Sequence, residues 1–131
     1  PRILRETREW LDIYFSGKRP DFTPALAPQG SDFRKVVWEE LLKIPYGCTI
    51  TYGQIAKQVA DRKGILRMSA QAVGGAVGHN PIGIIIPCHR VVGTGGNLTG
   101  FGGGIRTKEA LLKLEGMDMG RFYIPKKGTA L

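Results

Sequence analysis

The segment TYGQIAKQVADRKGILRMSAQAVGGAVG, residues 51–78, decides the fold of this chain. Thr51 stands three residues before Gln54, which is the capping-box pattern at the start of a helix. Gly64 interrupts the helical pattern, and Ser69 can cap a second, shorter helix. Two short helices joined by a short connection predict a helix-turn-helix, although two packed helices of any small α-helical domain are the commoner source of such spacing.

Two adjacent glycines lie inside the second of these helices. Gly74 and Gly75 each cost up to ~1 kcal/mol relative to alanine in a helix interior. A helix that keeps two glycines at this cost is expected to need a backbone without side chains there. The two alternatives are a neighbouring element packed closely against it and a nucleic-acid backbone lying along it.

The composition is that of one globular domain with an excess of basic residues. The chain has 131 residues, of which 42% are hydrophobic, and 19 Lys and Arg against 11 Asp and Glu give a net charge of +8. This balance favours a polyanionic partner such as DNA or RNA. The two cysteines lie forty positions apart, which predicts reduced thiols. A long apolar run and a signal-peptide pattern are both absent, which predicts no membrane association and a cytoplasmic location.

The segments on either side of residues 51–78 predict further helices, a linker and a strand. Apolar spacing predicts helices at residues 2–16 and from 31 or 32 to 43, and the Pro- and Gly-rich residues 17–30 between them form an extended linker. GIIIP, residues 83–87, predicts a short buried strand, and a last helix runs from near Thr107 to Gly116. The expected organisation is a leading helix and linker at 1–30, one main domain at 31–120 and a tail at 121–131.

The run IIIPCHRVVG, residues 84–93, sets a cysteine beside a histidine directly after a proline. Cys88 is a strong nucleophile only as a thiolate, and His89 is the candidate base that would generate it through a bridging water. Glu115, at the end of the last helix, can hold the tautomer of His89 if that helix packs behind the pair. Ordinary structural roles remain open: Cys88 as a small buried apolar residue, and His89 as a core histidine bonded to backbone.

A metal site is not expected. Zinc would need both cysteines and both histidines of the chain, and neither a C-x-x-C nor an H-x-x-x-H spacing is present. Cys48, in PYGCTI, is interpreted as a small buried apolar residue.

GHNPIGIIIPCHRVVGTGGNLTGFGGGIRTKEALLKLEG, residues 78–116, strongly resembles the methylated-DNA–protein-cysteine methyltransferases, also called O6-alkylguanine-DNA alkyltransferases. The resemblance covers residues 31–116, with the PCHR core, the preceding Asn-Pro, the Gly-rich loop and the Lys-to-Glu-Gly helix in order. It implies a mainly α fold with a small β element, containing a winged-helix-like helix-turn-helix. The N-terminal α/β domain of full-length members is expected to be largely absent, and the helix at 2–16 resembles the last helix of that domain.

The resemblance implies a DNA repair methyltransferase that works once. The thiolate of Cys88 takes the alkyl group from O6-alkylguanine, with O4-alkylthymine as a further candidate, after the base is flipped out of double-stranded DNA approached from the minor groove. His89 acts as a base through water, Glu115 orients it, and Tyr52 helps to protonate the departing guanine. No cofactor is used, the alkylated protein is not regenerated, and a monomer is expected.

The resemblance also assigns residues to the DNA interface and to the substrate pocket. Asn80 would tie the second helix of the helix-turn-helix to the active-site strand. The carbonyls of Cys88 and Val91 would read the guanine amine, and the Gly102 amide would lie near O6. The implied DNA contacts are Thr51, Tyr52, Gly53, Ala70, Gln71, Gly74 and Thr94, and the implied pocket residues are Val77, Asn80, Val91, Leu98, Phe101 and Gly102.

Three features depart from the usual family pattern. Gln71 stands where an arginine usually fills the space of the flipped base, Phe101 replaces a pocket tyrosine, and the connection ADRKGILRM at 60–68 is several residues longer. Two other functions stay open. One is an inert damage-binding regulator of the alkyltransferase-like kind, which lacks the cysteine that this chain keeps. The other is a cysteine hydrolase using Cys88, His89 and Glu115.

Overall fold

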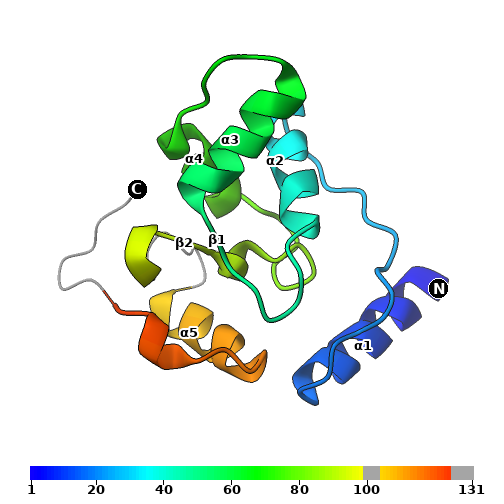
Figure 1. The fold of residues 1–131 in the computed structure, drawn as a ribbon. Coiled ribbons are helices and arrows are strands. Elements are labelled where there is room, and N and C mark those ends of the chain that lie inside the picture. Colours follow the sequence, from blue (N-terminus) through cyan, green and yellow to red (C-terminus); the bar gives the residue numbers. More distant parts are fainter. Residues whose placement is uncertain (99–103, 125–131) are drawn as a thin grey trace.

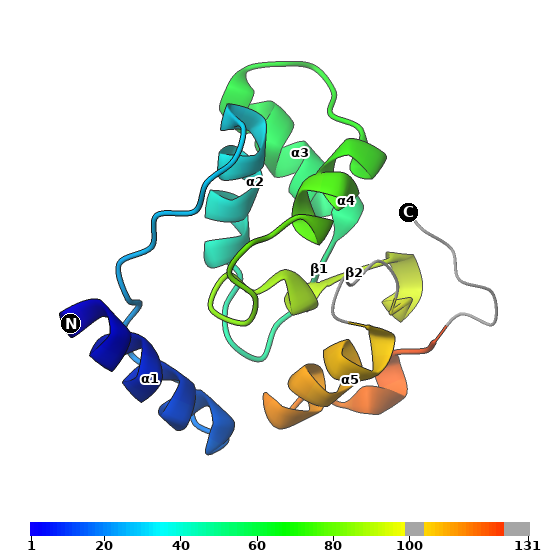
Figure 2. The same cartoon turned by 180° about the vertical axis from the view of Figure 1, so that it is seen from behind.

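The structure is a computed structural model that describes residues 1–98 and 104–124. Three helices gather at one end of the molecule, a very small sheet lies in the middle, and two further helices lie at the other end (Figures 1 and 2). The elements are α1 (Arg2–Phe15), α2 (Asp32–Leu42), β1 (Ile50–Thr51), α3 (Tyr52–Lys63), α4 (Ala70–Gly78), β2 (Val91–Val92) and α5 (Ile105–Leu114), with 3₁₀ turns at Cys88–Arg90, Thr94–Gly96 and Met119–Arg121.

Helices α3 and α4 form the predicted helix-turn-helix, and both begin with the predicted caps. The Thr51 hydroxyl accepts from the Gln54 amide, and the Gln54 side chain accepts from the Thr51 amide, so the capping box is complete. Gly64 ends α3 at a φ of 68°, a left-handed conformation that favours glycine. The Ser69 side chain accepts from two amides in the first turn of α4.

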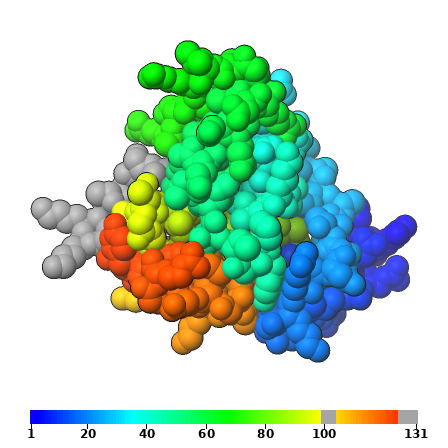
Figure 3. All heavy atoms as spheres, viewed as in Figure 1, coloured from blue at the N-terminus to red at the C-terminus, as the bar shows by residue number. Residues whose placement is uncertain are grey.

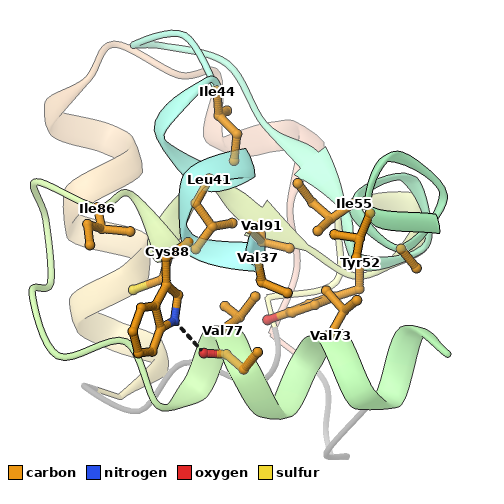
Figure 4. Packing of buried hydrophobic residues seen from close by; sticks show 14 residues of the cluster. Val37, Leu41, Ile44, Tyr52, Ile55, Val73, Val77, Ile86, Cys88 and Val91 are labelled. Carbon is orange, nitrogen blue, oxygen red and sulfur yellow. Dashed lines mark hydrogen bonds between the residues drawn. The ribbon is translucent and has the colours of Figure 1, made fainter. Parts of the chain in front are cut away.

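The main core lies where α2 packs across α3 and α4 (Figure 4). Trp38 of α2 is almost fully buried, and its indole Nε1 donates to the carbonyl of Ala76 in α4 at 2.9 Å. This bond joins α2 to the helix that carries the paired glycines. The apolar side chains around it are Val37, Leu41, Ile55, Val59, Val73 and Val77.

The predicted strand at 83–87 is wrong, because these residues form turns. The side chain of Asn80 takes over the hydrogen bonds that a neighbouring strand would supply. Its Nδ2 donates to the Ile86 carbonyl at 2.8 Å, and its Oδ1 accepts from the Ile82 amide at 3.0 Å. Ile84 has a φ of 70°, which an extended strand excludes. The observed strand follows the PCHR run instead, since β2 pairs in parallel with β1, with Ile50 opposite Val91 and Thr51 opposite Val92.

Helix α1 packs against the rest of the molecule and does not project from it (Figure 3). Its buried residues Trp10 and Tyr14 pack with Ile85 and with Leu111 of α5. Residues 17–30 then run as an irregular segment from this end of the molecule to α2 (Figure 1). In the described part of the chain, no helix combines the length and the apolar character needed to cross a membrane.

Trp38→Ala is expected to lower the free energy of unfolding by about 3–5 kcal/mol, because it empties the contact between α2 and α4 and leaves the Ala76 carbonyl without its donor. Trp38→Phe keeps most of the ring and should cost clearly less. Urea denaturation of the parent and both variants measures the difference. Equal losses for the two variants would show that the ring itself does not fill this contact.

Candidate active site

Cys88 opens a 3₁₀ turn that directly precedes β2. Pro87 stands before it, and the Cys88 amide donates to the Ile86 carbonyl at 2.8 Å, which fixes the turn. The side chain is only 7% exposed and packs with Val77 and Val91 (Figure 4). Burial raises the pKa of the thiol, although the Asn80 side chain and the nearby charge of an α5 lysine act to lower it. The thiol is therefore protonated at neutral pH and needs a base.

His89 lies next to Cys88, is completely buried and contacts a carboxylate. Its Nε2 lies 2.5 Å from Oε2 of Glu115. Burial lowers the pKa of His89 even though the Glu115 carboxylate acts to raise it, so the imidazole is neutral at neutral pH. A neutral imidazole that donates from Nε2 carries its lone pair on Nδ1. Nδ1 is buried and has no hydrogen-bond partner within residues 1–98 and 104–124, so it is available to accept a proton.

The carboxylate of Glu115 caps the end of α5 and collects donors from three distant parts of the chain. Oε1 accepts from the Gly47 amide and from Nε of Arg90, both at 2.9 Å. Oε2 accepts from the Tyr14 hydroxyl at 2.7 Å, from a second Arg90 nitrogen at 3.1 Å and from His89. Burial alone would raise the pKa of Glu115, but these hydrogen bonds outweigh it and lower the pKa to about 2.

A second pair of titratable groups faces the thiol from the other side. Lys108 of α5 is fully buried, its Nζ donates to the carbonyl of Val91, and Nζ lies 5.6 Å from the centre of the Tyr52 ring. Burial lowers the pKa of Lys108 to about 8, while a negative charge at Cys88 acts to raise it. Burial also raises the pKa of Tyr52, so this phenol stays protonated at neutral pH.

Three of these residues were missed by sequence reasoning. Arg90 follows the Cys-His pair and was assigned no function, yet it is buried and also donates to the Ile44 carbonyl at 2.9 Å. Lys108 stands three and four residues before the buried Leu111 and Leu112, and this helical spacing places it on the apolar face of α5. The spacing therefore could have predicted that Lys108 is buried. Tyr14 lies 101 positions before Glu115, and no local pattern connects them.

Comparison with known proteins shows the family of the chain. Residues 32–117 match the family model described as the DNA binding domain of 6-O-methylguanine DNA methyltransferase. The chain belongs to the 6-O-methylguanine DNA methyltransferase family. It is 50% identical over 114 residues to the methylated-DNA–protein-cysteine methyltransferase of Methanosarcina acetivorans, covering 87% of this chain and 70% of that protein. The Mycobacterium tuberculosis protein of the same name is 52% identical over 105 residues, covering 80% of this chain but 61% of that protein.

Solved structures of the family have the same architecture. Mycobacterium tuberculosis OGT in complex with DNA has a TM-score of 0.75 and 48% identity, over 88% of this chain and 67% of that one. Schizosaccharomyces pombe Atl1, bound to damaged DNA containing O6-carboxymethylguanine, has a TM-score of 0.52 and 25% identity, over 75% of this chain and 100% of that one. The expected fold class, a mainly α helix-turn-helix domain of this methyltransferase family, is confirmed.

The DNA contacts implied by the family resemblance differ in their exposure to solvent. Gly53, Gln71 and Thr94 are exposed, whereas Thr51, Ala70 and Gly74 are half-buried and Tyr52 is buried. Gln71 lies in the first turn of α4, and Thr94 lies in the turn after β2.

Three of the implied pocket residues lie around Cys88. Val77 and Val91 pack with the thiol, and Asn80 holds the turns before it. The carbonyls of Cys88 and Val91 already accept from the Val91 amide and from Lys108, so a guanine amine would use their second lone pairs. Leu98 instead packs in a separate apolar cluster with Val92, Leu112 and Met117. Phe101 and Gly102 lie outside the described residues.

The interpretation of Cys48 as a buried residue is wrong, because its side chain is exposed. It follows the turn at Tyr46 and Gly47 between α2 and β1, and its backbone amide donates to the Pro45 carbonyl at 3.1 Å. Among the described residues, no group of three or more His, Cys, Asp or Glu side chains is placed to hold a metal ion.

Because folding lowers the pKa of Glu115, the free energy of unfolding depends on pH in the acidic range. Its folded-state pKa of about 2 lies below its ordinary value of 4.5, so its contribution is fully present above pH 4.5 and is lost as the pH falls toward 2. The free energy of unfolding of the parent should therefore fall between these two pH values, and Glu115→Gln should have a flatter profile. Urea denaturation across this range measures both slopes. A slope in Glu115→Gln equal to that of the parent would contradict the assignment.

Proposed function

We propose that this chain repairs DNA by moving the alkyl group of O6-alkylguanine onto Sγ of Cys88. The observation that carries the proposal is the hydrogen bond from His89 to Glu115, which leaves Nδ1 of a neutral imidazole free to act as a base beside a protonated thiol. The membership of the chain in the 6-O-methylguanine DNA methyltransferase family supports the same reaction.

The reaction is a displacement at carbon in which atoms and charges balance. Nδ1 of His89 takes the thiol proton of Cys88 through one water, and Glu115 stabilises the imidazolium that results. The thiolate attacks the alkyl carbon, an S–C bond forms as the C–O6 bond breaks, and the electron pair stays on the guanine. The guanine then takes up a proton, with Tyr52 as the donor and solvent as the final source. The products are guanine and an S-alkylcysteine, so each chain reacts once.

The exposed face of α4 suits close contact with DNA. Gln71, Gly75 and Gly78 recur at intervals of four and three residues and are all exposed, so they share one side of the helix. A Cβ built at Gly75 or Gly78 would meet no described atom within 4 Å. Internal packing therefore does not require glycine at 75, which favours the nucleic-acid alternative for that residue. The similarity to the DNA complex of Mycobacterium tuberculosis OGT supports double-stranded DNA as the partner, and the minor-groove approach and monomeric state extend the proposal.

Cys88→Ala should abolish alkyl transfer and leave affinity for DNA nearly unchanged, because it removes the nucleophile and only one buried side-chain atom. Intact-mass spectrometry after incubation with duplex DNA containing O6-methylguanine should show one added methyl per parent chain and none on the variant. Cys48→Ala is the matched control, since its thiol is exposed, and it should gain the methyl like the parent. Transfer by Cys88→Ala would refute the assignment, and repeated turnover by the parent would indicate a hydrolase.

Gln71→Ala should slow repair of duplex DNA clearly and barely change the reaction with free O6-benzylguanine, which needs no base flipping. A flipped nucleotide leaves an unpaired base and a gap, and the amide of Gln71 offers a donor and an acceptor to fill it. Single-turnover rates on the two substrates isolate the flipping step. Equal rates of variant and parent on duplex DNA would show that another residue holds the gap open, and the candidates are Lys63 at the end of α3 and Arg67 in the connection to α4.

A further inference from the structure

Helix α1 lies outside the matched segment 32–117, yet one of its side chains reaches the centre of the site. Tyr14 is completely buried, and its ring stacks on Trp10 with centroids 5.2 Å apart. The same ring meets His89 edge to face at 6.3 Å. This packing fixes the phenol on the side of His89 that faces Glu115.

The hydroxyl of Tyr14 bridges the two groups that form the proposed base. It donates to Oε2 of Glu115 at 2.7 Å and lies 3.4 Å from Nε2 of His89. Oε2 is also the atom to which His89 donates, so both contacts of the hydroxyl act on one hydrogen bond. Burial and the hydrogen bond to Glu115 raise the pKa of Tyr14, which keeps the phenol protonated as a donor wherever the protein is folded.

We propose that Tyr14 is a positioning residue for alkyl transfer: its hydroxyl fixes Oε2 of Glu115 and thereby the tautomer and orientation of His89. Helix α1 then contributes a positioning residue to the site. This inference rests on the function proposed above.

A physical reason distinguishes this role from simple packing. Phenylalanine would supply the same stacked ring, so packing alone requires no hydroxyl at position 14. The Arg90 guanidinium also donates to Oε2 but at 3.1 Å, and it is shared with Oε1. The hydrogen bond from Tyr14 to Oε2 is thus shorter than the one from Arg90, and it holds Oε2 in place for His89. A hydrogen bond to a charged group is among the stronger ones in a protein.

Tyr14→Phe tests the hydroxyl, and Tyr46→Phe is the matched control. The Tyr46 ring lies 6.1 Å from the Tyr14 ring, and its hydroxyl is buried without a hydrogen-bond partner in the described residues. At neutral pH, Tyr14→Phe should lower the single-turnover rate with O6-benzylguanine by about tenfold, the size expected for losing one hydrogen bond to a charged group. Tyr46→Phe should react at the parent rate.

The pH profile separates positioning from structural damage. The groups that face His89 and Glu115 are Arg90, Lys108, Tyr46 and Cys88, all of which the parent and Tyr14→Phe share. Because these groups affect both rates in the same way, the ratio of the two rates at each pH removes the effect of their titration. This ratio should approach one at alkaline pH, where the thiol ionises without a base. A ratio that stays constant with pH, or equal rates throughout, would overturn the inference.

Nuclear magnetic resonance of the histidine rings gives a readout that does not depend on activity. The chain has two histidines, and His79 is exposed, so the buried ring can be assigned. The Nε2 proton of His89 should resonate far downfield in the parent and in Tyr46→Phe, and should shift or broaden in Tyr14→Phe.

A direct measurement on the parent covers the case in which Tyr14→Phe does not fold. The Tyr14 hydroxyl proton should exchange slowly and show a contact to the His89 Nε2 proton, and the absence of both signals would refute the inference. If the parent itself transfers no alkyl group, the proposed function fails, and the resonance data still decide whether Tyr14 positions His89.

Discussion

The buried carboxylate of Glu115 accepts hydrogen bonds from three segments that are far apart in the sequence. Tyr14 comes from α1, Gly47 from the turn before β1, and His89 with Arg90 from the 3₁₀ turn after Pro87. A charge taken out of water is tolerated only when it is paired and fully hydrogen-bonded, and removing one partner of a buried ion pair costs about 3–5 kcal/mol. The carboxylate therefore fixes the relative positions of these segments, and the geometry beside Cys88 follows from that constraint.

The same burial sets the protonation states of the reacting pair. Desolvation raises the pKa of the Cys88 thiol and lowers the pKa of His89, so both groups are neutral in the resting protein. A free thiolate would react with oxidants and other electrophiles, and a buried thiol avoids this. Glu115 already lies where it can stabilise a positive charge on the imidazole, as the proposed proton transfer from Cys88 requires.

The parts of the fold that were predicted from the sequence depend on local signals. The caps at Thr51 and Ser69 and the stop at Gly64 involve residues within three positions of their partners, and the structure has all three. The strand expected at 83–87 failed because the side chain of Asn80 satisfies backbone groups there, which apolar composition alone does not reveal. Cys88, His89 and Glu115 were proposed from the adjacent Cys-His pair and the end of the last helix, and the family resemblance implied the same three residues. The contact of Tyr14 with Glu115, 101 positions away, arises only from tertiary packing.

The parallel pair β1–β2 connects the end of the molecule that carries the helix-turn-helix to the end that carries Glu115. β1 leads directly into the cap and first turn of α3, and β2 follows directly after Cys88–Arg90, so two hydrogen-bonded residue pairs join the two halves. On one side lie α3 and α4 with the exposed Gln71, and on the other lie α5 and α1 with Glu115 and Tyr14 (Figures 1 and 2). The exposed face of α4 and the network around Glu115 thus lie on different elements, and Tyr52 connects them, because it belongs to α3 while its ring lies 5.6 Å from Nζ of Lys108. Under the function proposed above, substitutions on the exposed face of α4 should act on duplex substrates alone, while substitutions at Tyr52 or in the Glu115 network should act on a free base as well.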